Sequence, residues 1–455
     1  MTWSSFAARS LNLFIVLPLI LKTFNASEIS LWYLLWSMIG FQNLGDLGFN
    51  VTFTRAVAYS LTDNAYNELQ GSSFTTKDVV VVMSKVYKII SVVMLFLALI
   101  VGSLLLKKPI TFLKNPLDGW ISWGIVLIVT NISIYGFKYS AFLQGINWVH
   151  LYRRWEALTI LAGSISSGIV LLAGGGLIGL VMINQFWVLV DVLRNRMLCN
   201  HYKKNIFIIK KSEKPNKELF SQLWNQAWRS GLGVLFSNGI LQLFNLAYAQ
   251  VFSPVILAPY LFGQRVIQQI VGFTRGTFYA KIPALNKMRS ENKVKQIIYT
   301  SQRTMRLSYI LFFAGMLVLL FFGNEILLVI KSNITLPPYL LLYVFGLGYL
   351  FERFGAMHIQ LYTTTNDVIW HKANGITAII IICIGIPLLF IGSIYALPIA
   401  FLAGNILFYS WYTSSYSYRA LKTTFSKYEK YLFMPGMIIY AIMGVIMVIT
   451  KRINL

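Results

Sequence analysis

Long apolar runs alternate with short polar and basic gaps along the whole chain. A helix needs roughly 20 mainly apolar residues to cross the hydrocarbon core of a bilayer. We therefore predict an all-α polytopic membrane protein with spans near residues 4–23, 28–55, 84–106, 120–143, 155–173, 177–194, 229–251, 255–278, 306–330, 338–363, 374–393 and 395–417. A further apolar run, residues 431–450, is also long enough to span.

The Lys and Arg residues of the gaps predict the orientation. Residues 195–229 carry eight of them and residues 281–306 carry seven, and both gaps fall on the same side if every helix crosses. Because basic loops remain in the cytoplasm, we predict a bacterial inner-membrane protein with a cytoplasmic N-terminus. The basic gap 107–118 is an exception, and a spanning helix at 431–450 would leave Lys451 and Arg452 outside. The topology of that helix therefore stays open.

Short matches at one offset suggest an internal repeat. Phe53-Thr54-Arg55 recurs 220 residues later as Phe273-Thr274-Arg275, and Arg9-Ser10 recurs as Arg229-Ser230. Parallel repeats of this kind build two-lobed transporters. We predict two pseudo-symmetric six-helix lobes, a basic cytoplasmic linker between them and an additional C-terminal helix. The boundaries are 1–194, 195–228, 229–417 and 418–455.

Composition supports a membrane protein and excludes several other classes. Charged residues make up 12% of the chain, about half of what soluble proteins contain. The net charge of +24 lies in gaps between apolar runs and not on a soluble basic face, so we expect no nucleic-acid partner. Two Cys and four His residues form no metal-binding, cofactor-binding or catalytic pattern. We expect neither an enzyme nor a bound cofactor or metal.

Polar and charged residues recur at helical spacing inside the predicted spans. Such residues are costly in lipid and usually face the interior of a helix bundle or a water-filled cavity. Arg265 lies about ten residues into its span, too deep for its charge to reach the headgroups easily. The candidate substrate contacts are Arg9, Arg55, Lys138, Arg265, Arg275, Arg353, Asn238, Gln242, Asn245, Gln268 and Tyr135. Asp46 and Glu352 are candidates for ion coupling or charge balance.

Excess Arg with carboxamides suits an anionic substrate that carries hydroxyl groups. Guanidinium groups bind phosphate through two parallel hydrogen bonds, and amides and Tyr hydroxyls bind sugar hydroxyls. A cationic substrate would require a net acidic cavity instead. The structural alternative is that these residues hold the helices together by hydrogen bonds. In that case Asp46 would neutralise Arg55 or Lys138.

The N-terminal region resembles a known family. The stretches Ser27–Tyr33 and Leu44–Phe49, together with Thr54-Arg55, are similar to those of polysaccharide flippases in the multidrug/oligosaccharidyl-lipid/polysaccharide exporter superfamily. The resemblance implies two lobes around a cavity that opens alternately to each side, and an undecaprenyl-diphosphate-linked oligosaccharide such as an O-antigen repeat unit as substrate. It also implies membrane lipids, a polysaccharide polymerase and the chain-length machinery as partners. The additional C-terminal helix departs from the twelve-helix plan of that family.

Two other functions stay open. A cation-coupled small-molecule exporter, of the multidrug type, would share the fold. A membrane polysaccharide polymerase or ligase would handle the same lipid-linked glycans. Such enzymes need a substantial periplasmic loop, whereas the longest predicted outer gap, residues 107–119, has only about a dozen residues.

Overall fold

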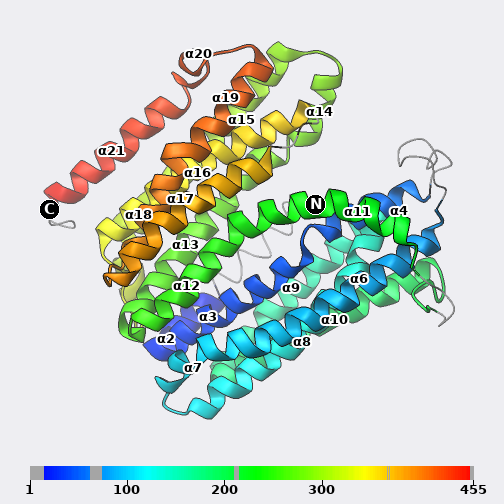
Figure 1. The fold of residues 1–455 in the computed structure, drawn as a ribbon. Coiled ribbons are helices and arrows are strands. Elements are labelled where there is room, and N and C mark those ends of the chain that lie inside the picture. Colours follow the sequence, from blue (N-terminus) through cyan, green and yellow to red (C-terminus); the bar gives the residue numbers. More distant parts are fainter. Residues whose placement is uncertain (1–14, 62–73, 210–214, 366, 368, 451–455) are drawn as a thin grey trace. The chain divides into compact units, whose positions relative to one another are not determined.

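The computed structural model describes residues 15–61, 74–209, 215–365, 367 and 369–450, and all the regular structure in these ranges is helical (Figure 1). This confirms the all-α prediction. Helices cross bilayers well because every backbone polar group inside them is hydrogen-bonded within the segment. The chain forms two compact units, residues 1–250 and 251–455.

The first unit contains one helix that is broken near residue 44 and several long ones. Its elements are α2 (Leu17–Thr23), α3 (Ala26–Asn43), η2 (Leu44–Asp46), α4 (Phe49–Tyr59), α6 (Thr76–Leu97), η3 (Ala98–Gly102), α7 (Ser103–Thr111), α8 (Pro116–Gly145), α9 (Val149–Leu172), α10 (Gly176–Tyr202), α11 (Lys217–Val234), η4 (Leu235–Gly239) and α12 (Ile240–Val251). The predicted linker 195–228 therefore includes the end of α10 and the start of α11. Contacts of α11 with α4 and α6 attach it to this unit.

The second unit begins with a helix that starts directly after Ser253. Its elements are α13 (Pro254–Tyr279), α14 (Ile282–Ser290), α15 (Val294–Val329), α16 (Tyr339–Tyr362), η5 (Thr363–Thr365), α17 (Trp370–Phe390), α18 (Ala396–Gly404), η6 (Asn405–Tyr409), α19 (Ser410–Leu421), α20 (Phe425–Glu429) and α21 (Phe433–Ile449). Helix α16 is central to this unit, because it packs against α13, α15, α18, α19 and α21.

Eight helices in the described part of the chain are long and apolar enough to cross a membrane. They are Thr76–Thr111, Pro116–Gly145, Val149–Leu172, Gly176–Tyr202, Gly231–Val251, Val294–Val329, Tyr339–Thr365 and Trp370–Phe390. Some of the predicted spans are not among these eight helices, for physical reasons. The first lies partly before residue 15, outside the described residues, and the span at 255–278 contains two Arg and three Gln, which lower its hydropathy.

The predicted span 28–55 is broken instead of continuous. Leu47 and Gly48 have φ angles of 46° and 76°, which a right-handed helix cannot contain. Helix α4 restarts at Phe49, and both carboxylate oxygens of Asp46 accept the backbone N–H of Asn50, at 3.1 and 3.2 Å. An acidic side chain is favourable at a helix N-terminus because it satisfies a free N–H group.

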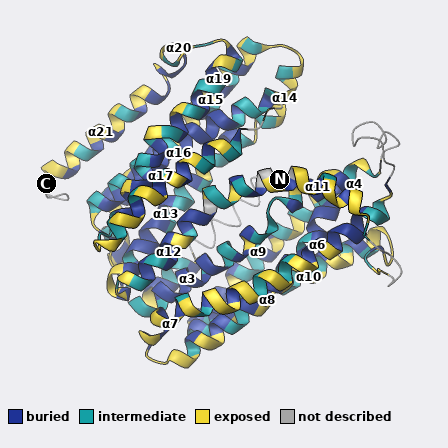
Figure 2. Cartoon of the chain, viewed as in Figure 1, coloured by how far each residue is buried: buried dark blue, intermediate teal, exposed yellow. Residues whose placement is uncertain are grey.

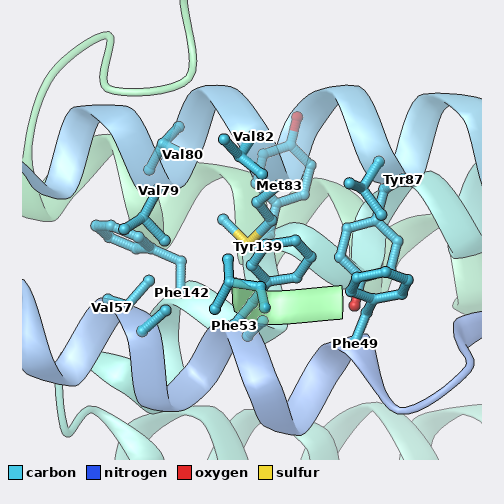
Figure 3. Packing of buried hydrophobic residues seen from close by; sticks show 14 of the residues in the cluster. Phe49, Phe53, Val57, Val79, Val80, Val82, Met83, Tyr87, Tyr139 and Phe142 are labelled. Atoms are coloured by element: carbon cyan, nitrogen blue, oxygen red, sulfur yellow. The ribbon is translucent and has the colours of Figure 1, made fainter. Parts of the chain in front are cut away.

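Apolar side chains of α4, α6 and α8 form the core of the first unit (Figure 3). Phe49 and Phe53 of α4 stack with ring centroids 5.4 Å apart, and Phe53 lies 5.8 Å from Tyr87 of α6. Phe142 of α8 belongs to the same cluster and is fully buried. This interlocked packing holds the three helices together close to Asp46.

The C-terminal helix α21 is attached to the second unit along a narrow seam. Its buried residues, spaced three and four apart, are Phe433, Gly436, Tyr440, Met443 and Met447. Most of its other residues are exposed, as the yellow segments in Figure 2 show. The 17 residues of α21 span about 25 Å at 1.5 Å per residue, slightly less than the roughly 30 Å hydrocarbon core. Its topology stays open.

We expect Gly145→Ala to destabilise the first unit. A Cβ atom at Gly145 would lie 2.6 Å from Cβ of Val57 and 2.8 Å from the carbonyl oxygen of Thr54, so α4 and α8 would have to separate. Overpacking of this kind costs about 1–3 kcal/mol, which would lower the melting temperature of the detergent-purified protein. The matched control is Gly124→Ala on the same helix, where a Cβ atom meets nothing within 4 Å. Equal melting temperatures for the two variants would refute the packing argument.

Candidate functional site

Helices α13 and α16 of the second unit bring charged residues together inside an apolar bundle. Arg265 and Arg275 lie on α13, and Glu352 and Arg353 lie on α16. An Nη2–Oε1 distance of 3.4 Å joins the Arg275 guanidinium to the Glu352 carboxylate.

Two tyrosine hydroxyls connect these charges. The hydroxyl of Tyr349 accepts a hydrogen bond from Nε2 of Gln268 at 3.2 Å and interacts electrostatically with Arg265, Arg275 and Glu352. The hydroxyl of Tyr409, in η6, interacts with Glu352, Arg275 and Arg353. Tyr349 thus contacts Gln268 directly and lies within electrostatic range of Arg265, Arg275 and Glu352.

Arg353 is the most deeply buried of these cations. Its side chain is 1% exposed, and none of its three guanidinium nitrogens has a hydrogen-bond partner among the described residues. Its guanidinium carbon lies 5.6 Å from the centroid of the Tyr279 ring, within the range of a cation–π interaction. A buried guanidinium without hydrogen bonds is costly, so this group requires an additional partner.

We use the name α13–α16 cluster for Arg265, Gln268, Arg275, Tyr349, Glu352, Arg353 and Tyr409. It contains three guanidinium groups and one carboxylate, and therefore has a net positive charge. Such a cluster attracts anions and repels cations. Its hydroxyl and amide groups add neutral hydrogen-bonding capacity. Sequence reasoning missed Tyr349 and Tyr409, although Tyr349 lies three residues before Glu352 and so on nearly the same face of α16.

Gln242 and Asn245 of α12 lie in a different place, against α3 of the first unit. Nδ2 of Asn245 is 3.3 Å from Oγ of Ser37, and the side chain of Gln242 packs against Gly40. Also on α3, the fully buried Gln42 has no hydrogen-bond partner among the described residues for either atom of its amide group. These contacts hold α3 and α12 together. The amide atoms of Gln42 and Oδ1 of Asn245 have no hydrogen-bond partner among the described residues.

Lys138 packs against aromatic rings and not against a carboxylate. It is 2% exposed, and its Nζ lies 3.4 Å from the centroid of the Tyr135 ring and 5.1 Å from that of Tyr139. Asp46 instead accepts a hydrogen bond from the Tyr87 hydroxyl at 2.7 Å. The described contacts of Asp46 are thus to the start of α4 and to Tyr87, and its neutralisation of Lys138 or Arg55 stays a prediction.

The remaining predicted residues are placed only in part. Arg55 is an exposed residue of α4. Arg9 lies outside the described residues, and the side chain of Asn238 is not described. Lys138 and Tyr135 form a contact with each other within the first unit, while Gln242 and Asn245 form the seam with α3. The α13–α16 cluster holds the predicted site residues of the second unit.

Comparisons with solved structures show which fold this is. An inward-facing multidrug resistance MATE family transporter of the MOP superfamily superposes with a TM-score of 0.69 at 13% identity, over 91% of this chain and 94% of that chain. A multidrug resistance MATE family transporter in the outward-facing conformation gives 0.60 at 12% identity, over 92% and 93%. A MOP superfamily transporter from Pyrococcus furiosus, described as having a binding pocket of reverse polarity that suggests a different function, gives 0.62 at 13%, over 93% and 96%.

No protein-family model matches the sequence, and no curated protein matches it either. The likeness to the solved structures is therefore one of fold. The chain is a multi-pass membrane protein with the fold of MATE family transporters, and a positively charged cluster lies between two helices of its second unit.

We expect Tyr87→Phe to destabilise the protein, because it removes the hydroxyl that donates to the part-buried Asp46 carboxylate. A hydrogen bond to a charged group contributes about 1.5–3 kcal/mol, which predicts a clear fall in melting temperature in detergent. Tyr299→Phe is the control, because Tyr299 is 67% exposed. An unchanged melting temperature for Tyr87→Phe would mean that Asp46 does not depend on this bond.

Proposed function

We propose that this protein is a flippase that moves an undecaprenyl-diphosphate-linked oligosaccharide, such as an O-antigen repeat unit, across the bacterial inner membrane. The observation that carries the proposal is the charge of the α13–α16 cluster, with three Arg residues against one Glu. A diphosphate placed alone in hydrocarbon has a prohibitive solvation cost. Guanidinium groups inside the bundle would replace the lost hydration of the diphosphate.

The groups of the cluster divide between the two parts of this substrate. Arg265 would bind the diphosphate, and Arg275 would receive it near the cytoplasmic mouth. Gln268 and Tyr349 would hydrogen-bond sugar hydroxyls, because amides and phenols both donate and accept. The undecaprenyl chain would stay in the bilayer, where it has no desolvation cost.

The proposed direction is from the cytoplasmic to the periplasmic leaflet. By the positive-inside rule, the basic gaps 195–229 and 281–306 would lie on the cytoplasmic side, and the N-terminus with them. The fold is shared with transporters solved in inward-facing and outward-facing conformations. Alternating access on this fold would carry the headgroup across without exposing it to lipid.

The alternative is a cation-coupled exporter of small molecules with the same fold. A cationic substrate would require surplus carboxylates near the site, whereas the one carboxylate of the α13–α16 cluster already pairs with Arg275. The Pyrococcus furiosus transporter has a pocket described as reversed in polarity, which supports charge as the feature that separates substrate classes on this fold. The charge of the cluster therefore favours the anionic substrate.

We expect Arg265→Ala to weaken binding of undecaprenyl diphosphate. The full chain in nanodiscs would be titrated with undecaprenyl diphosphate and with undecaprenol, which has the same tail but no phosphate. A hydrogen bond to a charged group contributes about 1.5–3 kcal/mol of binding free energy. Its loss predicts about 10- to 150-fold weaker binding of the diphosphate. Arg265→Lys should restore only part of the affinity, because an ammonium group cannot form two parallel bonds.

The matched control is Arg303→Ala, on an exposed part of α15 within the basic gap 281–306. This variant should bind both lipids as the native protein does. Equal affinity of the native protein for undecaprenol and undecaprenyl diphosphate would contradict the proposal. In the native host, Arg265→Ala should also abolish surface polysaccharide at unchanged protein level.

We expect Glu352→Gln to strengthen binding of undecaprenyl diphosphate. The substitution removes the only carboxylate of the α13–α16 cluster and releases Arg275 from its ion pair. A change of about 1 kcal/mol corresponds to roughly 5-fold tighter binding. Glu291→Gln is the control, because it breaks an exposed pair with Lys293 outside the cluster, at 2.7 Å. Weaker binding by Glu352→Gln would show that this carboxylate helps to hold the ligand.

A further inference from the structure

The ion pair of Arg275 and Glu352 joins the two helices that carry the α13–α16 cluster. Helices α13 and α16 lie side by side in the second unit (Figure 1). The Nη2–Oε1 distance of the pair is 3.4 Å, whereas charge-assisted N–H···O bonds are usually about 2.7–2.9 Å long. The contact is therefore a loose one, and another anion can compete with the Glu352 carboxylate for the Arg275 guanidinium.

This pair is open to a ligand and to a proton. The side chains of Arg275 and Glu352 are 43% and 19% exposed, while the pair of His358 and Glu429 in the same unit is fully buried. Oε2 of Glu352 has no hydrogen-bond partner among the described residues. A proton can therefore bind that oxygen without breaking a hydrogen bond within the described part of the chain.

Glu352 differs from the groups around it in its capacity to accept a proton. Tyrosine hydroxyls and arginine guanidinium groups already carry their protons near pH 7, so a carboxylate is the group that can take up one more. The charged and titratable groups that interact with Glu352, with Arg275 or with their tyrosine neighbours are Arg265 and Tyr279 of α13, Tyr349 and Arg353 of α16 and Tyr409 of η6.

We propose that Glu352 binds one proton when an anionic headgroup takes its place on Arg275. The inference rests on the proposed function, because the headgroup is the diphosphate assigned there. Phosphate oxygens replace Oε1 of Glu352 at the Arg275 guanidinium, and the carboxylate then faces the negative charge of the diphosphate. Burial and a neighbouring negative charge both favour the neutral form of a carboxyl group.

The exchange makes the proton a second ligand of the same site. One O–H bond forms at Glu352 with a proton taken from water, so the occupied site holds one proton more than the empty site. Because linkage is reciprocal, a proton on Glu352 must strengthen headgroup binding as much as the headgroup strengthens proton binding. Headgroup and proton are then bound and released together, and the pH on each side of the membrane controls loading and release.

The pH dependence of binding tests this exchange. The full chain in nanodiscs would be titrated between about pH 6 and pH 9 with undecaprenyl diphosphate esterified to a single sugar. A diphosphate with both ends esterified lacks the ionisation near pH 6 of a terminal phosphate, so the pH dependence reports on the protein. Native affinity should rise as the pH falls, by up to about tenfold per pH unit, which is the limit for uptake of one proton.

Glu352→Gln should bind this lipid with the same affinity throughout that pH range, because its amide resembles the protonated carboxyl group and cannot titrate. The matched control is Glu291→Gln, which lies outside the α13–α16 cluster and should keep the native pH dependence. Native affinity that does not change with pH would overturn the proposal. The same pH dependence in Glu352→Gln as in the native protein would also overturn it, because the proton would then bind elsewhere.

A direct measurement on the native protein covers the case in which Glu352→Gln fails to fold. A pH indicator in weakly buffered solution should report uptake of up to one proton per bound lipid within the pH range where affinity changes most. Absence of uptake there would overturn the proposal without any variant. Equal affinity for this lipid and for undecaprenol is a different result, since it would refute the proposed function itself and this inference with it.

Discussion

Positive charge held inside an apolar helix bundle is the constraint on which the rest of this structure depends. A buried guanidinium group keeps its proton and cannot escape its desolvation cost by neutralisation. In the second unit, Arg353 of α16 is 1% exposed, and the partly exposed Arg275 of α13 pairs with the Glu352 carboxylate. The proposed anionic headgroup would supply negative charge to this cluster.

The sequence alone predicted the class of fold and the helices that carry the charge. Hydropathy, spacing and loop charge were sufficient for an all-helical membrane protein, because the hydrocarbon core demands long apolar segments. The break at Leu47 and Gly48 was not predicted, since it depends on backbone angles and on the Asp46 cap. Spans with many polar residues, such as α13, also fall below a simple hydropathy threshold even though the helix is present.

Individual partners were harder to predict than positions. Arg265, Arg275, Glu352 and Arg353 do gather, but the sequence contains nothing that selects Arg275 over Arg265 as the partner of Glu352. Lys138 was a plausible partner for Asp46, yet its flexible side chain turns to the Tyr135 ring. Such choices depend on tertiary packing across helices that are far apart in the sequence. The roles of these residues in binding stay predictions.

Arg353 differs from the other two cations of the α13–α16 cluster, because it is 1% exposed and its guanidinium lies beside the Tyr279 ring. The proposed function therefore assigns the headgroup to Arg265 and Arg275. The most direct test of the central claim is a structure of the full chain in nanodiscs with bound undecaprenyl diphosphate. The account predicts phosphate oxygens within hydrogen-bond distance of the Arg265 guanidinium, and a diphosphate bound elsewhere, with Arg265 facing acyl chains, would contradict it.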